Sequence, residues 1–213
     1  MDTNGNTMKH DPTESIMPVN DDVPPLIIQS EREVFHEKGG ADFAVTESIV
    51  TIRKTGERLQ FHVASVRNGK TGAVCVVQKH DENGTPAFLI ARHWRISTKQ
   101  WAWEFPRGME MDDEDATATA IRELQEETGL KVSRNQVTIL QHMHADTGVL
   151  RDDIAIARIL IPNTDATPSH DDWELANDHW VSKDTLQRMI AAGEITDAIT
   201  LASWTVFQAH ASY

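Results

Sequence analysis

The sequence is poor in cysteine, in positive charge and in long apolar runs. Cys75 is the single cysteine among 213 residues, so no disulfide can form within the chain, which suits a reducing cytoplasm. The net charge is −13, which argues against nucleic acid or an anionic membrane as the main partner. No apolar run approaches the roughly 20 residues of a membrane helix, and the start lacks the basic and apolar segments of a secretory signal. We therefore expect a cytoplasmic globular protein that binds neither nucleic acid nor membrane.

Three segments of different character follow one another. Residues 1–25 are rich in Asp, Asn, Thr and Pro and are expected to form a flexible tail. Residues 26–66 contain two stretches that alternate apolar and polar residues, joined by a turn at 54–57, which indicates an N-terminal β-hairpin extension. Residues 67–213 then form the main domain.

The main domain mixes strand and helix patterns, so its class is α/β or α+β, with a mixed sheet between helices. Cys75 falls in a short apolar strand, where a buried thiol is the expected state. The polar stretch 162–177 is long enough to be an active-site loop. We expect strands at 72–78, 87–92, 101–105, 136–143, 154–161 and 179–181, and helices at 114–128, 183–192 and about 197–210.

One predicted helix, within 108–130, carries three clustered acids. Four acidic residues at 112–115 stand where this helix would start, and Gly129 stands where a left-handed residue would end it. Glu123, Glu126 and Glu127 fall at i, i+3 and i+4, within an arc of roughly 100°. Three like charges on one face destabilise a free helix, and a hard divalent cation such as Mg²⁺ would remove that repulsion and bridge to substrate phosphates.

A solvated acidic surface is the ordinary interpretation of a Glu-rich helix. The complete spacing favours a functional site instead, because seven fixed residues make a chance match very unlikely. The pattern is Gly108, five residues, Glu114, seven residues, then Arg122-Glu123-Leu124-x-Glu126-Glu127-x-Gly129-Leu130. It resembles the Nudix box at every fixed position. This resemblance implies a Nudix-type α/β/α sandwich.

The resemblance also implies the roles of the box residues. Glu123 and Glu127 would be the primary metal ligands, with Glu126 and the backbone carbonyl of Arg107 joining them, and the metal would be Mg²⁺ or Mn²⁺. Gly108 would permit a tight approach of the chain to the metal. Arg122, which can pair with Glu126 or reach back to Glu114, would orient the carboxylates together with Glu114.

Residues before the box resemble the ADP-ribose pyrophosphatase subgroup. Glu104-Phe-Pro-Arg-Gly108 is similar to its Glu-Leu-Pro-Ala-Gly stretch, and Arg92-His-Trp-Arg95 stands where that group often has Gln-Tyr-Arg. The resemblance implies hydrolysis of ADP-ribose to AMP and ribose 5-phosphate by a homodimer in which residues 26–66 take part. Trp101 and Trp103 indicate either one packed face of a strand or a platform for a base. The substrate-binding residues predicted in this way are Arg92, Trp94, Arg95, Trp103 and Gly108.

The general base of this subgroup is often a Glu on the late loop. Asp171-Asp172-Trp173-Glu174 is the matching stretch here, and Glu174 is the predicted base, although an exposed acidic loop residue is an equally ordinary interpretation. His142, His144 and His170 are rival bases.

Two other functions remain open at this point. The enzyme could hydrolyse other nucleotide sugars or dinucleoside polyphosphates, or the chain could be a non-catalytic Nudix domain that senses a nucleotide. The intact box speaks against the sensor.

Overall fold

The structure is a computed structural model that describes residues 23–37, 39–70, 72–162, 167–168 and 175–211. Most of the predicted tail lies outside these residues. The elements are β1 (Leu26–His36), β2 (Phe43–Ile52), β3 (Arg58–Val66), β4 (Gly72–His80), β5 (Pro86–Arg95), β6 (Gln100–Glu104), β7 (Arg107–Gly108), α1 (Ala116–Thr128), β8 (Val137–Met143), β9 (Leu150–Arg151), β10 (Ile154–Ile161), β11 (Leu175–Ser182), α2 (Lys183–Ala191) and α3 (Ala198–Ala211).

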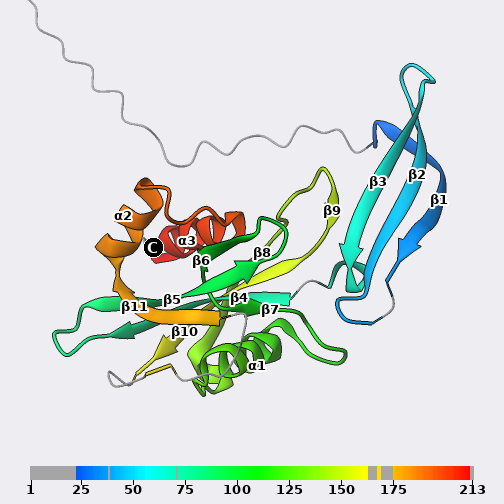
Figure 1. Ribbon diagram of the computed structural model, residues 1–213. Coiled ribbons are helices and arrows are strands. Elements are labelled where there is room, and N and C mark those ends of the chain that lie inside the picture. Colours follow the sequence, from blue (N-terminus) through cyan, green and yellow to red (C-terminus); the bar gives the residue numbers. More distant parts are fainter. Residues whose placement is uncertain (1–22, 38, 71, 163–166, 169–174, 212–213) are drawn as a thin grey trace, which may run out of the picture.

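The main domain has three layers. Its sheet has the order β11-β5-β4-β10-β8, with β6 paired to β5 and β7 paired to β4. Strands β4 and β10 are parallel and the other neighbours are antiparallel, so the sheet is mixed. Helix α1 covers one face, and α2 and α3 cover the other (Figure 1). The predicted α/β/α sandwich with a mixed sheet is confirmed.

Strand β4 supplies the centre of both hydrophobic cores. Its side chains alternate between the faces, and nearly all of them are buried. Cys75 and its odd-numbered neighbours pack under α1 against Ala120 and Leu124. Val74 and Val76 pack on the other face, with Trp204 of α3. Cys75 is a buried free thiol, as expected from the apolar strand.

The gap that holds the candidate site opens between β4 and β5. These strands pair only near their shared turn, at Gln78–His80 with Pro86–Phe88. Beyond that point β5 pairs with β6 and β4 pairs with β7. The segment from Glu104 to Gly108 therefore crosses between two diverging strands, above the helix that carries the glutamates.

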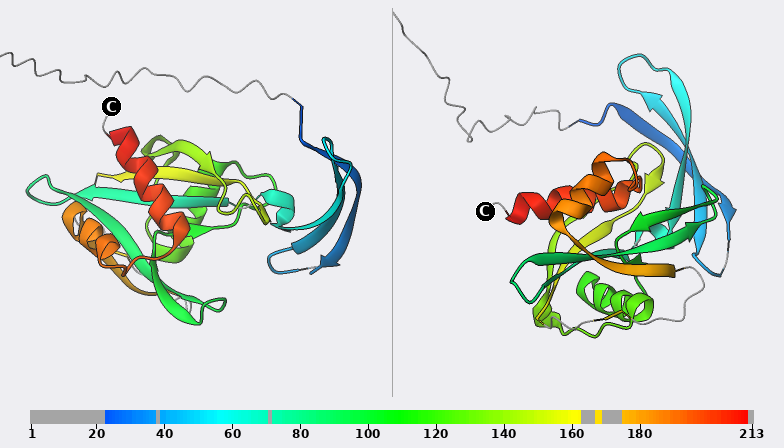
Figure 2. Two further views of the ribbon diagram at one scale, coloured as in Figure 1. Left: turned by 90° about the horizontal axis from the view of Figure 1, so that it is seen from above. Right: turned by 60° about the vertical axis from the view of Figure 1, so that its left-hand side comes forward.

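The N-terminal extension has more strands than the predicted hairpin. Strand β1 pairs with β2, and β9, which lies between two of the predicted strands, pairs with β3. The alternation of β1 was not visible in the sequence because register shifts between Ile28 and Ser30 and between Glu33 and Phe35 interrupt it. The β1–β3 sheet stands to one side of the sandwich (Figures 1 and 2).

Two helices begin close to where the sequence places them. Helix α1 starts at Ala116, two residues later than expected, because Asp115 is its N-cap. Helix α2 starts after Ser182, which caps it: the Ser182 hydroxyl accepts a hydrogen bond from the backbone N–H of Thr185. Within the described ranges, no helix combines the length and apolar character needed to cross a membrane.

Candidate active site

The ends of α1 fix how its glutamates face the sheet. The Asp115 carboxylate accepts a hydrogen bond from Ala118 N–H at 2.8 Å, and Gly129, with φ 71°, ends the helix in the left-handed conformation. Ala120 and Leu124 are fully buried against the sheet. This packing turns Glu123 and Glu127 towards the segment that crosses between β4 and β5.

Gly108 is required because the Glu123 carboxylate occupies the space next to it. A Cβ added at Gly108 would lie 1.9 Å from the carboxyl carbon of Glu123. At the start of β4, next to Ala73, which pairs with Gly108, Gly72 has φ +118°, and a Cβ there would lie 1.9 Å from the carbonyl oxygen of Gly108. The structure thus shows a close approach of Gly108 to a carboxylate, and the approach to a metal stays a prediction.

Glu127 is a buried carboxyl group held by the backbone. One of its oxygens accepts a hydrogen bond from Arg107 N–H at 3.0 Å. Burial raises the pKa of Glu127 to about 8, and the nearby Glu123 charge adds to the rise, while the Arg107 hydrogen bond opposes it. In the part of the chain that the structure describes, no lysine or arginine forms an ion pair with Glu127. A cation bound here would stabilise its ionised form.

Arg122 forms hydrogen bonds with the other acids of the box. Its guanidinium donates to Glu114 at 2.9 Å, to Glu123 at 2.7 Å and to Glu126 at 2.8 Å. It also donates to the carbonyl oxygen of Met109 at 2.7 Å, which ties down the loop before the helix. Hydrogen bonding from Arg122 lowers the pKa of Glu114, whereas burial raises that of Glu123. Both predicted contacts of Arg122, with Glu126 and with Glu114, are present together.

The oxygen ligands expected for a metal are close to one another but are held by the protein itself. Among the described residues, no three Asp, Glu, His or Cys side chains are grouped so that they could hold a metal ion directly. Glu123 and Glu126 share Nη1 of Arg122, and Glu127 is bonded to the Arg107 backbone. The donor set consists of carboxylate oxygens and a buried carboxyl group without a cationic partner, which fits Mg²⁺ or Mn²⁺.

A second charged network, which the sequence analysis did not assign to the site, involves Glu104. This side chain is 1% exposed. It accepts two hydrogen bonds from Arg95 and one from Nε of Arg107 at 2.9 Å. Burial would raise the pKa of Glu104, but the Arg95 hydrogen bonds and the charges of both arginines lower it below its ordinary value. Glu104 therefore positions Arg107, whose backbone holds Glu127. The place of Glu104 in the Glu-Phe-Pro-Arg-Gly stretch was the sequence signal that could have assigned it to the site.

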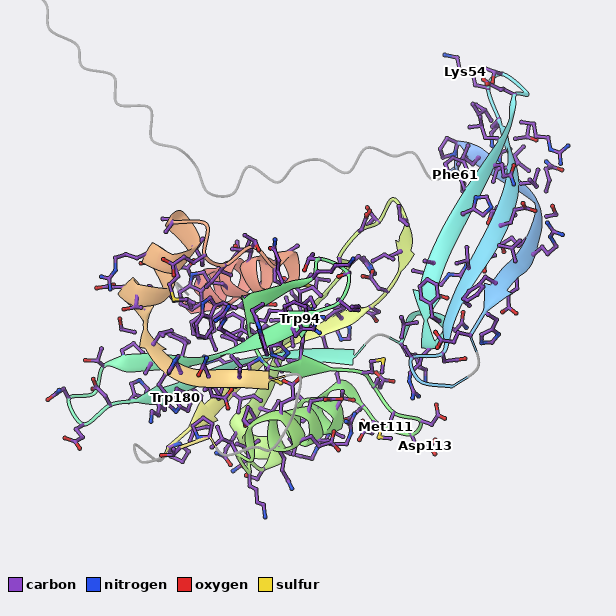
Figure 3. The ribbon with its side chains drawn as sticks, viewed as in Figure 1. Lys54, Phe61, Trp94, Met111, Asp113 and Trp180 are labelled. Atoms are coloured by element: carbon purple, nitrogen blue, oxygen red, sulfur yellow. The ribbon has the colours of Figure 1, made fainter. Side chains whose placement is uncertain are left out.

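The predicted substrate-binding residues divide between two faces of the β5–β6 pair. Arg95 and Glu104 point to one face, so Arg92, Trp94 and Trp103 point to the other. The Arg92 guanidinium lies 5.7 Å from the ring centres of Trp101 and Trp103, and the Trp94 and Trp101 rings meet edge to face. Figure 3 shows Trp94 over the sheet and Met111 near the start of α1, on the other side. Arg95 and Gly108 adjoin the glutamates, whereas Trp94 packs on Trp101 and Trp103 packs on His179.

The predicted general base is not among the residues brought together here. Glu174 and His170 lie outside the described residues. His142 forms a 2.8 Å contact with Asp153 on the exposed surface, and His144 contacts the Asp152 carbonyl oxygen. The identity of the base stays a prediction.

A cavity of about 320 Å³ adjoins the site. The guanidinium groups of Arg95 and Arg107 stand at its charged end, and most of its remaining wall is aliphatic. An anionic group and an apolar group of one ligand could therefore be bound side by side. The residues that line it are Val66, Ala73, Arg95, Arg107, Gly108, Met109, Ile154 and Ile199.

Comparisons with known proteins agree with this geometry. The model of the NUDIX domain family matches residues 69–202. No curated protein sequence matches the chain. The crystal structure of an ADP compounds hydrolase is similar with a TM-score of 0.68 and 13% identity, covering 87% of this chain and 94% of that one. At this identity, the likeness shows a shared fold.

Proposed function

Because the chain belongs to the Nudix domain family, and is a Nudix hydrolase acting on pyrophosphate bonds, we propose that it cleaves nucleoside diphosphate-sugars with the help of Mg²⁺. ADP-ribose is the favoured substrate, and AMP and ribose 5-phosphate are the products. The observation that carries the proposal is the buried Glu127, held by the Arg107 backbone beside Glu123. Similarity to an ADP compounds hydrolase supports a substrate that contains ADP.

The metal would be held by the acids of α1. Glu123 and Glu127 are the proposed primary ligands, joined by Glu126 and the Arg107 carbonyl oxygen. A bound Mg²⁺ polarises phosphoryl oxygens and lowers the pKa of a bound water. Arg122 and Glu114 would hold the carboxylates in position, and release of Glu123 and Glu126 from Arg122 would make their oxygens available.

The substrate would lie across the cavity described above. Arg95 and Arg107 each use only some of their N–H groups in hydrogen bonds to Glu104, so the remaining N–H groups of both can bind diphosphate oxygens. The aliphatic wall suits the base of the nucleotide. Glu174 is the proposed base that accepts the proton of the attacking water. Contacts of Arg92, Trp94 and Trp103 with substrate are retained only as predictions.

A panel of nucleotides tests this function. We expect ADP-ribose to be cleaved fastest, to yield AMP and ribose 5-phosphate, and to require added Mg²⁺, with no turnover in chelator. Product chromatography over ADP-ribose, other nucleotide sugars and dinucleoside polyphosphates is the measurement. Faster cleavage of another panel member would reassign the substrate, and nucleotide binding without any cleavage would indicate a sensor.

The protein is proposed to be a homodimer that buries the β1–β3 sheet. This sheet, of order β1-β2-β3-β9, has exposed apolar side chains and would gain stability by packing against another surface. Ile28 is 62% exposed and Phe61 is 42% exposed, and the register of β1, β2 and β3 puts both on one face. The low cysteine content and the negative charge further suit a cytoplasmic enzyme that binds neither nucleic acid nor membrane.

Sedimentation velocity of the full chain tests the dimer. We expect a dimer for the wild type and a shift of at least about tenfold towards monomer for Phe61→Asp, because a charge would be buried at the interface. Lys54→Asp is the matched control, since Lys54 lies at the exposed β2–β3 turn of the same sheet (Figure 3). A monomeric wild type at micromolar concentration would contradict the dimer.

A further inference from the structure

A second cavity shares one wall with the first. It has a volume of about 260 Å³ and is also lined by Arg95 and Arg107. Its other walls come from the β5–β6 turn and from the residues that lead into α3. We call it the polar cavity. Its polar side chains are those of Ser97, Thr98, Gln100, Glu104, Thr196, Asp197 and the two arginines, and Trp101, Ala102 and Ala198 also line it.

The polar cavity offers both hydrogen-bond donors and acceptors. Ser97 and Thr98 carry hydroxyl groups, and Gln100 lies on the same face of β6 as Glu104 because side chains alternate along the strand. Asp197 uses one oxygen to accept from the N–H and hydroxyl of Thr200. Its other oxygen lies 3.7 Å from Arg107, beyond hydrogen-bond distance. A ligand here would find partners for hydroxyl groups on several sides.

Positive and negative side chains are equal in number in the wall that contains Arg95 and Arg107. Two guanidinium groups, of Arg95 and Arg107, face two carboxylates, of Glu104 and Asp197. A polyphosphate tail that extended past the two arginines into the cavity would gain little, because the Asp197 carboxylate repels it. A nucleobase could pair with only some of the hydroxyl and amide groups of Ser97, Thr98, Gln100 and Thr196, which line the cavity at the surface. A neutral, hydroxyl-rich ring meets neither objection.

We propose that the polar cavity binds the sugar attached to the far phosphate of the substrate, while the diphosphate lies across Arg95 and Arg107 and the nucleoside occupies the apolar cavity. This inference rests on the proposed function. The volume agrees with it, since about 260 Å³ is below the range of roughly 300–1,000 Å³ for whole ligands and leaves room for one part of a ligand. Thr98 and Gln100 thereby become specificity-determining residues for the sugar.

The double variant Thr98→Ala/Gln100→Ala tests the assignment. We expect its KM for ADP-ribose to rise about tenfold, as for two lost hydrogen bonds. Its KM for ADP carrying a methyl ester in place of the sugar should stay unchanged, because that ester has the same phosphoanhydride. Ile96→Ala is the control, since Ile96 is 78% exposed in the same turn and does not line the cavity.

A binding measurement separates this inference from the proposed function. Calorimetry with the non-hydrolysable methylene analogue of ADP-ribose should show about tenfold weaker binding to the double variant, with circular dichroism confirming its fold. Equal affinity for both proteins, or an equal KM change for both substrates, overturns the sugar site. Absence of analogue binding to the wild type also overturns it. If the wild type binds the analogue but cleaves no nucleotide of the panel, the proposed function is wrong. The sugar site is then decided by the difference in analogue affinity between the wild type and the double variant.

Discussion

The Glu127→Gln variant is expected to keep its fold and to lose about three orders of magnitude in kcat, because one charged partner of the metal is removed. Loss of several kcal/mol of electrostatic stabilisation in the transition state corresponds to such a factor. The amide has nearly the shape of the carboxylate, and its oxygen can still accept the hydrogen bond from Arg107 N–H. Burial already disfavours the charged form of Glu127, so the neutral substitute should not lower Tm without metal.

Three measurements decide this prediction. Steady-state kinetics with ADP-ribose gives the loss in kcat, calorimetry with Mg²⁺ gives the loss in metal affinity, and thermal melting in chelator reports on the fold. Glu82→Gln, in the exposed β4–β5 turn, is the matched carboxylate control and should behave as the wild type. Near wild-type turnover by Glu127→Gln would remove this residue from the metal site.

The Glu174→Gln variant is expected to lower kcat by about 10²–10⁴, the range for loss of a general base, with little change in KM. Glu174 directly precedes β11 in the chain, and the first residue of that strand pairs with His93. The acidic limb of the pH–rate profile should change with the rate, because that limb reports the base.

Neighbouring residues provide the comparison for Glu174. Asp171→Asn and Asp172→Asn lie in the same stretch and should each change kcat less than about threefold. His142→Asn, His144→Asn and His170→Asn examine the rival bases. An unchanged rate for Glu174→Gln would place the base elsewhere, either at a histidine or within the box itself.

Helix α1, which lies within the box, shows which features can be predicted from the spacing of residues within one segment. The offsets among Glu123, Glu126 and Glu127, the cap at Asp115 and the stop at Gly129 are properties of one continuous helix, so they could be predicted without knowing any other part of the fold. The ion pair of Arg122 with Glu126, at i+4, was predictable for the same reason, whereas Glu114, which also pairs with Arg122, precedes the helix.

The partners that come from other strands could not be predicted in this way. Glu104 becomes buried between Arg95 and Arg107 only because β4 and β5 diverge and the crossing segment fills the gap. Trp94 and Trp103 are near the box in sequence, yet their places on β5 and β6 turn them to the face opposite Glu104. Strand pairing decides such contacts, and no local pattern in those segments encodes the pairing.

By itself, the amino-acid sequence determined the family, because the box depends on residue spacing within one segment, and the resemblance to that family implied the three-layer class and the acids proposed as metal ligands. Only the tertiary structure decided that Gly108 makes room for Glu123, that Glu127 is held by a backbone N–H and that two cavities of opposite character share Arg95 and Arg107. Those contacts join segments far apart in the chain, and their distances depend on how the sheet opens.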